Sequence, residues 1–119
     1  MGEAMSITIY HNPRCSKSRE ALALLEEKRI KPKVVEYLKS PPSSVELARI
    51  LKKLGLKPRD ILRQSEPLYR ELDLKHKELT DKALIALMVE NPILIERPIV
   101  VTGERAALGR PPAKVLEIL

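Results

Sequence analysis

The residue with the clearest chemical potential is Cys15, the only cysteine in this chain of 119 residues. A thiol attacks other molecules as the thiolate, and nearby positive charge or the N-terminus of a helix favours that form. Both are expected at Cys15, because a helical pattern begins at Ser16 and basic residues surround the sulfur. These basic residues are Arg14, Lys17 and Arg19. We therefore predict that Cys15 is an accessible nucleophile, ionised near neutral pH.

The same loop is expected to bind an oxyanion. Backbone N–H groups at the start of a helix, together with the hydroxyls of Ser16 and Ser18, offer hydrogen-bond donors to a tetrahedral anion. The formal net charge of +6 fits an anionic substrate, an acidic partner or nucleic acid. Nucleic acid is the weakest of these, since the chain has three tyrosines and no Phe or Trp on which bases could stack.

Other kinds of cysteine site fit the residues less well. A buried structural cysteine should have apolar neighbours, whereas those of Cys15 are polar or turn-forming. A phosphatase loop needs an arginine six residues after the cysteine, where this chain has Ala21. A dithiol motif needs a second cysteine at the position of Ser18. Any disulfide of Cys15 must therefore form with another molecule.

The elements that position Cys15 follow from hydrophobic spacing and from breaker residues. A short β-branched run ends at Tyr10, and residues 11–13 interrupt it before a helix begins. Ser43 or Ser44 and Thr80 are the expected N-caps of later helices, and Gly55 is an expected C-cap. In chain order we expect strands at 7–10 and 34–38 flanking a helix at 16–29, helices at 45–54, 58–63 and 82–90, strands at 99–101 and 106–108, and a helix at 112–119.

This order predicts an α/β fold of the thioredoxin-like type. A strand, a helix and a second strand give a parallel pair, and the closing hairpin adds antiparallel strands to the same mixed sheet. The pattern is βαβ, then helices, then ββα, with a helical insertion at about residues 43–92. At this length we expect a single domain over residues 1–119.

Composition also predicts where the protein works. No apolar run is long enough to span a membrane, and the N-terminus lacks the basic and apolar layout of a signal peptide. A lone cysteine cannot form an internal disulfide or, by itself, a zinc site. We expect a cytoplasmic protein with no metal and no membrane partner.

Several segments spread over nearly the whole chain match one known pattern. They are residues 9–19, Tyr37-Leu38 with Pro41-Pro42, Leu62-Arg63 with Glu66-Pro67, residues 91–101 and Gly109-Arg110-Pro111. On these residues the sequence resembles the glutaredoxin-coupled arsenate reductase family of the thioredoxin-like superfamily, in the branch with an Asn-Pro-Arg-Cys-Ser-Lys-Ser-Arg loop.

The resemblance implies a reaction and a set of residues. It implies reduction of arsenate to arsenite by the Cys15 thiolate, with glutathione as co-substrate, glutaredoxin as partner and no bound cofactor. It carries a catalytic arginine triad onto Arg63, Arg97 and Arg110, and it implies a cis peptide bond before Pro98. It also implies that residues near the thiol adjust its pKa or bind the oxyanion, and that His11 can form an ion pair with the thiolate. These neighbours are His11, Arg14, Ser16, Lys17, Ser18 and Arg19.

Two other functions remain open at this point. One is an RNA-polymerase-binding redox regulator of the same superfamily, although its usual Cys-x-x-Cys switch has Ser18 in place of the second cysteine. The other is a monothiol glutaredoxin-like oxidoreductase that acts on glutathione adducts. Loss of turnover in a Cys15→Ser variant would separate an enzyme from a binding module.

Overall fold

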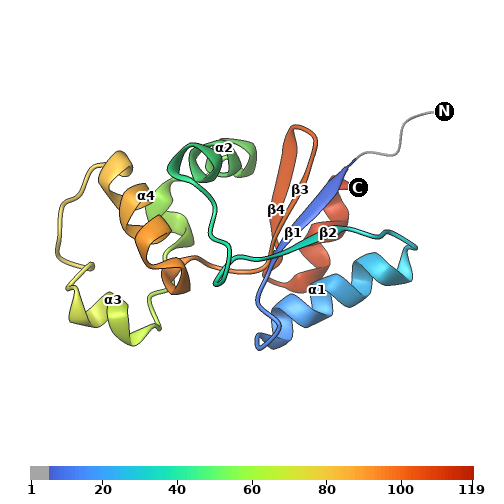
Figure 1. Cartoon of the computed structure of the whole chain (residues 1–119), viewed down its shortest axis with the longest axis horizontal. Coiled ribbons are helices and arrows are strands. Elements are labelled where there is room, and N and C mark those ends of the chain that lie inside the picture. The colour runs from blue at the N-terminus through green and yellow to red at the C-terminus, as the bar shows by residue number, and fades with distance from the viewer. Residues whose placement is uncertain (1–5) are drawn as a thin grey trace. The chain divides into compact units, whose positions relative to one another are not determined.

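The computed structural model describes residues 6–119. It contains a four-stranded mixed sheet formed by strands from both ends of the chain. Its strands are β1 (Ile7–His11), β2 (Lys33–Glu36), β3 (Ile99–Thr102) and β4 (Arg105–Leu108). The strand order is β2-β1-β3-β4, with β1 parallel to β2 and antiparallel to β3, and β3 antiparallel to β4 (Figure 1). This topology confirms the predicted α/β fold with a mixed sheet.

Two helices pack on one face of this sheet and on each other. They are α1 (Ser16–Glu27) and the 3-10 helix η3 (Pro112–Ile118). The core between them and the sheet contains Ile9, Ala21, Leu25, Val100 and Val115, which are all fully buried. Ala21 and Leu25 lie four residues apart, so one stripe of α1 faces the sheet. This packing fixes the end of β1 and the start of α1, and with them the loop that carries Cys15.

The chain divides into two compact units. The first unit contains the sheet, α1 and η3, in residues up to Ser40 and in Arg97–Leu119, and the second unit is Pro41–Glu96. The expected helical insertion at 43–92 lies within the second unit. The first five residues, which are half of the ten-residue N-terminus in which the sequence shows no signal-peptide layout, lie outside the described residues. Among residues 6–119, no helix combines the length and apolar character needed to cross a membrane.

The second unit is built from short helices. In chain order they are α2 (Ser44–Leu54), η1 (Pro58–Ile61), α3 (Pro67–Glu71), α4 (Asp81–Glu90) and η2 (Pro92–Leu94). The predicted caps are confirmed: Ser43 Oγ accepts from the Glu46 N–H at 3.1 Å, and Thr80 Oγ1 accepts from the Ala83 N–H at 3.1 Å. Gly55 ends α2 in the left-handed conformation, with φ of 69°.

Several boundaries differ from those expected. β2 ends at Glu36 rather than Leu38, because the chain turns there and the Lys39 N–H donates to the Glu36 carbonyl at 2.9 Å. α1 ends two residues early, because Arg29 adopts a left-handed conformation with φ of 61°. The helix expected at 58–63 is a 3-10 helix that stops at Ile61, and the C-terminal helix is also 3-10. The short helices α3 and η2 were not expected.

Two arginine–proline bonds in the first unit are cis. The Arg97–Pro98 bond is cis, as the resemblance implies, and the Arg110–Pro111 bond is a second cis bond that the sequence did not indicate. The two segments meet where the Gly109 N–H donates to the Pro98 carbonyl at 2.8 Å. A Cβ atom at Gly109 would lie 2.7 Å from Cγ of Pro98 and 3.1 Å from Cγ1 of Val115.

We predict that Gly109→Ala destabilises the protein by about 1–3 kcal/mol, because the added methyl group overpacks this contact. The matched change Gly55→Ala should cost about 1–2 kcal/mol, because its positive φ disfavours a side chain although its surroundings are open. Urea unfolding measures both costs. Only Gly109→Ala should also change the alkylation rate of Cys15, because a methyl group that displaces Pro98 also shifts the neighbouring Arg97, which hydrogen-bonds to the sulfur. An unaltered rate would contradict this prediction.

Candidate active site

Cys15 is the N-cap residue of α1 and is half-buried. Asn12, itself buried, folds the loop in front of it. Its side-chain Oδ1 accepts from the Arg14 N–H at 3.0 Å, and its carbonyl accepts from the Cys15 N–H at 3.0 Å. This double turn directs the chain from β1 into α1. The sequence analysis treated Asn12 only as a strand breaker, although an Asn before a proline is a turn signal.

The environment of Cys15 lowers the pKa of its thiol. Burial raises the pKa, but hydrogen bonds to the sulfur outweigh that effect. The donors are the Ser18 N–H, the Arg97 side chain and the Lys17 N–H, and the Arg97 charge lowers the pKa further. The predicted thiolate therefore has a physical basis in two backbone N–H groups and one guanidinium.

The charged group that acts on the sulfur differs from those expected. Sequence spacing pointed to Arg14, Lys17 and Arg19, whereas the guanidinium beside the thiol belongs to Arg97, which is only 8% exposed. Lys17 contributes through its backbone N–H. Arg14 and Ser16 are exposed. The cation that lowers the pKa of Cys15 thus lies 82 positions further along the chain than the thiol.

Arg19 has a different contact. Its Nη1 donates to the Pro13 carbonyl at 2.9 Å and so ties the first turn of α1 to the loop before Cys15. Its charge acts on His11, whose pKa it lowers.

His11 lies against Ser18. Its Nδ1 is 2.7 Å from Ser18 Oγ, which also accepts from the Asn12 N–H at 3.1 Å. Burial lowers the pKa of His11, Glu36 raises it and Arg19 lowers it, with a net decrease. A neutral imidazole can accept a hydrogen bond from the Ser18 hydroxyl at Nδ1. This environment disfavours the charged His11 that the expected ion pair with the thiolate requires, and the role of His11 toward Cys15 stays a prediction.

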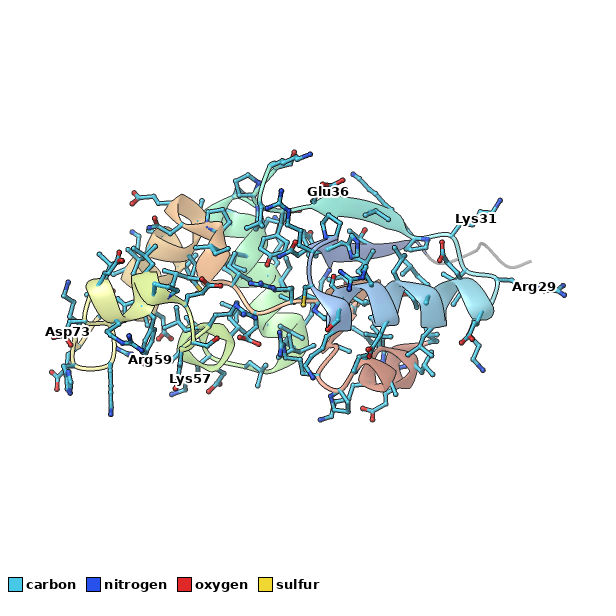
Figure 2. The ribbon with its side chains drawn as sticks, turned by 90° about the horizontal axis from the view of Figure 1, so that it is seen from below. Arg29, Lys31, Glu36, Lys57, Arg59 and Asp73 are labelled. Carbon is cyan, nitrogen blue, oxygen red and sulfur yellow. The ribbon has the colours of Figure 1, made fainter. Side chains whose placement is uncertain are left out.

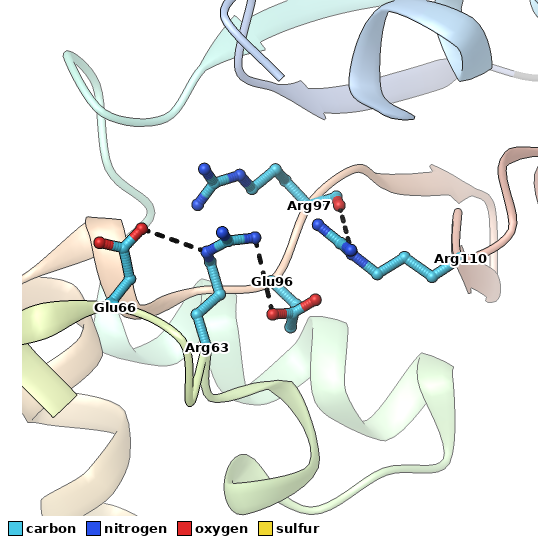
Figure 3. A network of polar contacts seen from close by, with 5 residues as sticks. All are labelled: Arg63, Glu66, Glu96, Arg97 and Arg110. Atoms are coloured by element: carbon cyan, nitrogen blue, oxygen red, sulfur yellow. Dashed lines mark hydrogen bonds and ion pairs between the residues drawn. The ribbon is translucent and has the colours of Figure 1, made fainter. Parts of the chain in front are cut away.

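Arg110 is joined to Arg97 in the first unit. Its Nε donates to the Arg97 carbonyl at 3.0 Å (Figure 3). Cys15, Arg97 and Arg110 are therefore linked by consecutive contacts within one unit. Such a group can hold a tetrahedral anion and attack it, because guanidinium groups are permanently charged and bind oxyanions through several N–H donors.

Arg63 belongs to the second unit. Its Nε donates to Glu66 Oε1 at 3.3 Å, and its Nη1 lies 3.7 Å from Glu96 Oε1 (Figure 3). Its guanidinium is thus held between two carboxylates that the sequence analysis did not single out as site residues. The role of Arg63 toward a substrate of Cys15 stays a prediction.

Two surface cavities lie away from these residues. One, of about 950 Å³, lies in the first unit. Its lining includes Arg29 and Lys31, whose side chains extend outward (Figure 2). The other, of about 450 Å³, lies around Tyr69 and His76 in the second unit. Neither contains a predicted site residue. Within residues 6–119, no group of three or more His, Cys, Asp or Glu side chains is arranged to hold a metal ion.

The comparisons with known proteins show the family of the chain. The model of the ArsC family matches residues 10–118, which include Cys15, Arg63, Arg97 and Arg110. The chain belongs to the ArsC family. The resemblance that its loop and arginines indicated is thereby confirmed.

Similar proteins cover nearly the whole chain. An arsenate reductase of Haemophilus influenzae is 50% identical over 97% of this chain and 100% of its own length. An uncharacterized protein of Escherichia coli K12, YfgD, is 53% identical over 95% of this chain and 96% of its own. The solved structure of an arsenate reductase from Vibrio cholerae is 56% identical, covers 98% of this chain and 100% of its own, and superposes with a TM-score of 0.94.

We predict that Arg97→Gln moves the pH midpoint of Cys15 alkylation upward. The variant removes both the hydrogen bond and the charge that lower the thiol pKa, so less thiolate is present at neutral pH. The measurement is the rate of reaction with iodoacetamide over a pH series. Arg14→Gln is the matched control, since Arg14 is exposed and is not among the groups that act on the sulfur. Equal midpoints in both variants would contradict the assignment.

We predict that His11 makes the protein less stable as the pH falls. In the unfolded chain a histidine takes up its proton near pH 6.5, whereas the folded-state pKa of His11 is lower. The unfolded state therefore binds more protons between these two values, and the free energy of unfolding should decrease as the pH drops below about 6.5. Urea unfolding at several pH values should show a smaller decrease in His11→Gln. The same decrease in both proteins would contradict a lowered pKa of His11 in the folded protein.

Proposed function

We propose that this protein is an arsenate reductase in which the Cys15 thiolate reduces arsenate to arsenite. The observation that carries the proposal is the lowered pKa of Cys15, produced by Arg97 and by the first N–H groups of α1. These groups also offer positive charge and hydrogen-bond donors at the place where an attacked oxyanion must sit. The family and the named relatives support the same substrate.

The reaction uses two thiols. The Cys15 sulfur attacks arsenic, and one oxygen of arsenate leaves as water after protonation, which forms a sulfur–arsenic bond. The glutathione thiolate then attacks the Cys15 sulfur. The electron pair of the sulfur–arsenic bond passes to arsenic, which leaves as arsenite, and Cys15 is left in a mixed disulfide with glutathione. Glutaredoxin reduces this disulfide and restores the thiol.

Three arginines are proposed to hold the oxyanion. Arg97 and Arg110 are linked to each other and, through Arg97, to the sulfur. Arg63 is included because the resemblance places a third arginine there. Planar guanidinium groups neutralise the charge that develops on arsenate oxygens during attack, and a lysine in their place would give fewer fixed donors.

The loop residues are proposed as secondary contacts. The N–H groups of Lys17 and Ser18 already donate toward the sulfur, and the exposed Ser16 hydroxyl is available to an anion. Arg14 and Arg19 add positive charge to the loop that carries Cys15. His11 and Ser18 hold the backbone of this loop through their hydrogen bonds.

Glutathione and glutaredoxin are proposed because the chain has one cysteine only. Two electrons are needed to reduce arsenate, and a single thiol supplies them only if a second thiol completes the disulfide. The free thiol and this dependence on reduced glutathione are in keeping with a cytoplasmic protein that carries no bound cofactor.

The direct test is turnover with arsenate, glutathione and glutaredoxin. We expect release of arsenite by the wild-type protein, loss of all turnover in Cys15→Ser, and a glutathione adduct on Cys15 when glutaredoxin is omitted. Mass spectrometry measures the adduct, and an arsenite assay measures the product.

The outcome also separates the alternatives. Reduction of glutathione adducts without arsenite release would indicate a monothiol glutaredoxin-like enzyme. Capture of RNA polymerase by both the wild-type protein and Cys15→Ser, with no turnover in either, would indicate the regulator. Either result would reject arsenate reduction.

A further inference from the structure

We infer that Arg14 and Lys17 select the second thiol, the one that attacks the Cys15 sulfur, and that they favour a thiol bearing carboxylates over a neutral or cationic one. The inference rests on the proposed function, in which a second thiol completes the reaction. It gives these two side chains a specificity for the reductant, which holding arsenate does not require.

Arg14 and Lys17 belong to the loop and first helical turn that carry Cys15, all within the first unit. The Arg14 N–H donates to Asn12 Oδ1 at 3.0 Å, and the Lys17 N–H donates to the Cys15 sulfur. These contacts use backbone groups only, so they fix the main chain of both residues near the sulfur and leave both side chains for other contacts. Both residues are exposed.

The positive charges of these two side chains are not used by the fold. The third cation of the loop is engaged, because Arg19 Nη1 donates to the Pro13 carbonyl at 2.9 Å. Among residues 6–119, the side chains of Arg14 and Lys17 form no hydrogen bond or ion pair. Glu20, the nearest acidic residue along the chain, pairs with neither of them. Both charges therefore face solvent without a neutralising partner.

The two charges also do not set the acidity of the nucleophile. The side-chain charge that lowers the pKa of Cys15 is that of Arg97. Lys17 acts on the sulfur through its backbone N–H, and Arg14 is not among the groups that act on it. The charges of Arg14 and Lys17 are thus left for a molecule that reaches the half-buried sulfur from solvent.

The chemistry of the second thiol gives these charges a use. This thiol must reach the Cys15 sulfur itself to form the mixed disulfide. Glutathione bears two carboxylates and one ammonium group at neutral pH, so its thiolate approaches with more negative charge than that of a neutral thiol. Cations beside the sulfur attract such a molecule and raise its rate of encounter, whereas they repel the ammonium group of a cationic thiol. Arg14 and Lys17 thus favour a carboxylate-bearing reductant.

The experiment measures attack on the Cys15 sulfur in the absence of arsenate. Reaction with 2,2′-dithiodipyridine places a thiopyridyl group on Cys15 through a disulfide, and excess reagent is removed. An added thiolate then attacks the Cys15 sulfur, forms a new disulfide with it and releases thiopyridone, whose absorbance gives the rate. The added thiols are glutathione, neutral 2-mercaptoethanol and cationic cysteamine, at neutral pH and low salt. Their intrinsic differences in reactivity cancel when each variant is compared with the wild-type protein.

In Arg14→Gln and in Lys17→Gln, the rate ratio of glutathione to 2-mercaptoethanol should fall about twofold to fivefold, the effect of removing one exposed charge pair. The rate ratio of cysteamine to 2-mercaptoethanol should rise in both variants. Arg14→Lys should keep most of the wild-type ratio, because it keeps the charge. The matched control is Lys28→Gln, an exposed change at the opposite end of α1, which should leave both ratios unaltered.

Other outcomes count against definite statements. If Arg14→Gln and Lys17→Gln, folded by their urea midpoints, both keep the wild-type ratios, the inference is overturned. An equal fall in Lys28→Gln would also overturn it, because the effect would then come from the net charge of the protein. If only one of the two loop variants changes the ratios, the role of the other residue is rejected.

The arsenate assay tests the proposed function separately. Arsenite release together with unaltered thiol ratios would reject the inference alone. Altered ratios without arsenite release would reject arsenate reduction and leave the selectivity for the second thiol. Should one loop variant fail to fold, the other measures the same ratios.

Discussion

The contact between the Arg97 guanidinium and the Cys15 sulfur is the interaction on which the site depends. A thiol that is partly buried would ordinarily stay protonated, because burial penalises the charged form. Here one guanidinium and two N–H groups of α1 reverse that effect. In the proposed function, the same groups that lower the thiol pKa also receive the incoming anion.

The first unit provides this contact by joining distant parts of the chain. β1 ends at His11 and leads into the loop of Cys15, while Arg97 lies immediately before Pro98 and β3. β1 and β3 are paired in the sheet, so the two loops lie at the same edge. Burial lowers the pKa of His11 and so disfavours its charged form, and its contact with Ser18 helps to hold the turn. The side-chain charge that lowers the pKa of Cys15 is thus that of Arg97.

The sequence predicted the order of strands and long helices because their apolar spacing and caps are local signals. It missed α3 and η2, which are too short for a helical repeat to appear, and the 3-10 character of η1 and η3. Cys15 could be predicted from its neighbours. Arg97 as its partner could not, because sheet pairing and not spacing brings it there, and only the resemblance named it. Glu96 as a neighbour of Arg63 could not be predicted either, because the bridge between Leu62 and Ile95 brings it there. The single-domain assignment stays a prediction.

The most direct measurement is the thiolate absorbance of Cys15 as a function of pH, in the folded protein and in the urea-unfolded chain. The signal belongs to one residue, because the chain has a single cysteine. The contact with Arg97 predicts a lower midpoint in the folded protein than in the unfolded chain. A folded midpoint equal to or above the unfolded one would contradict the account.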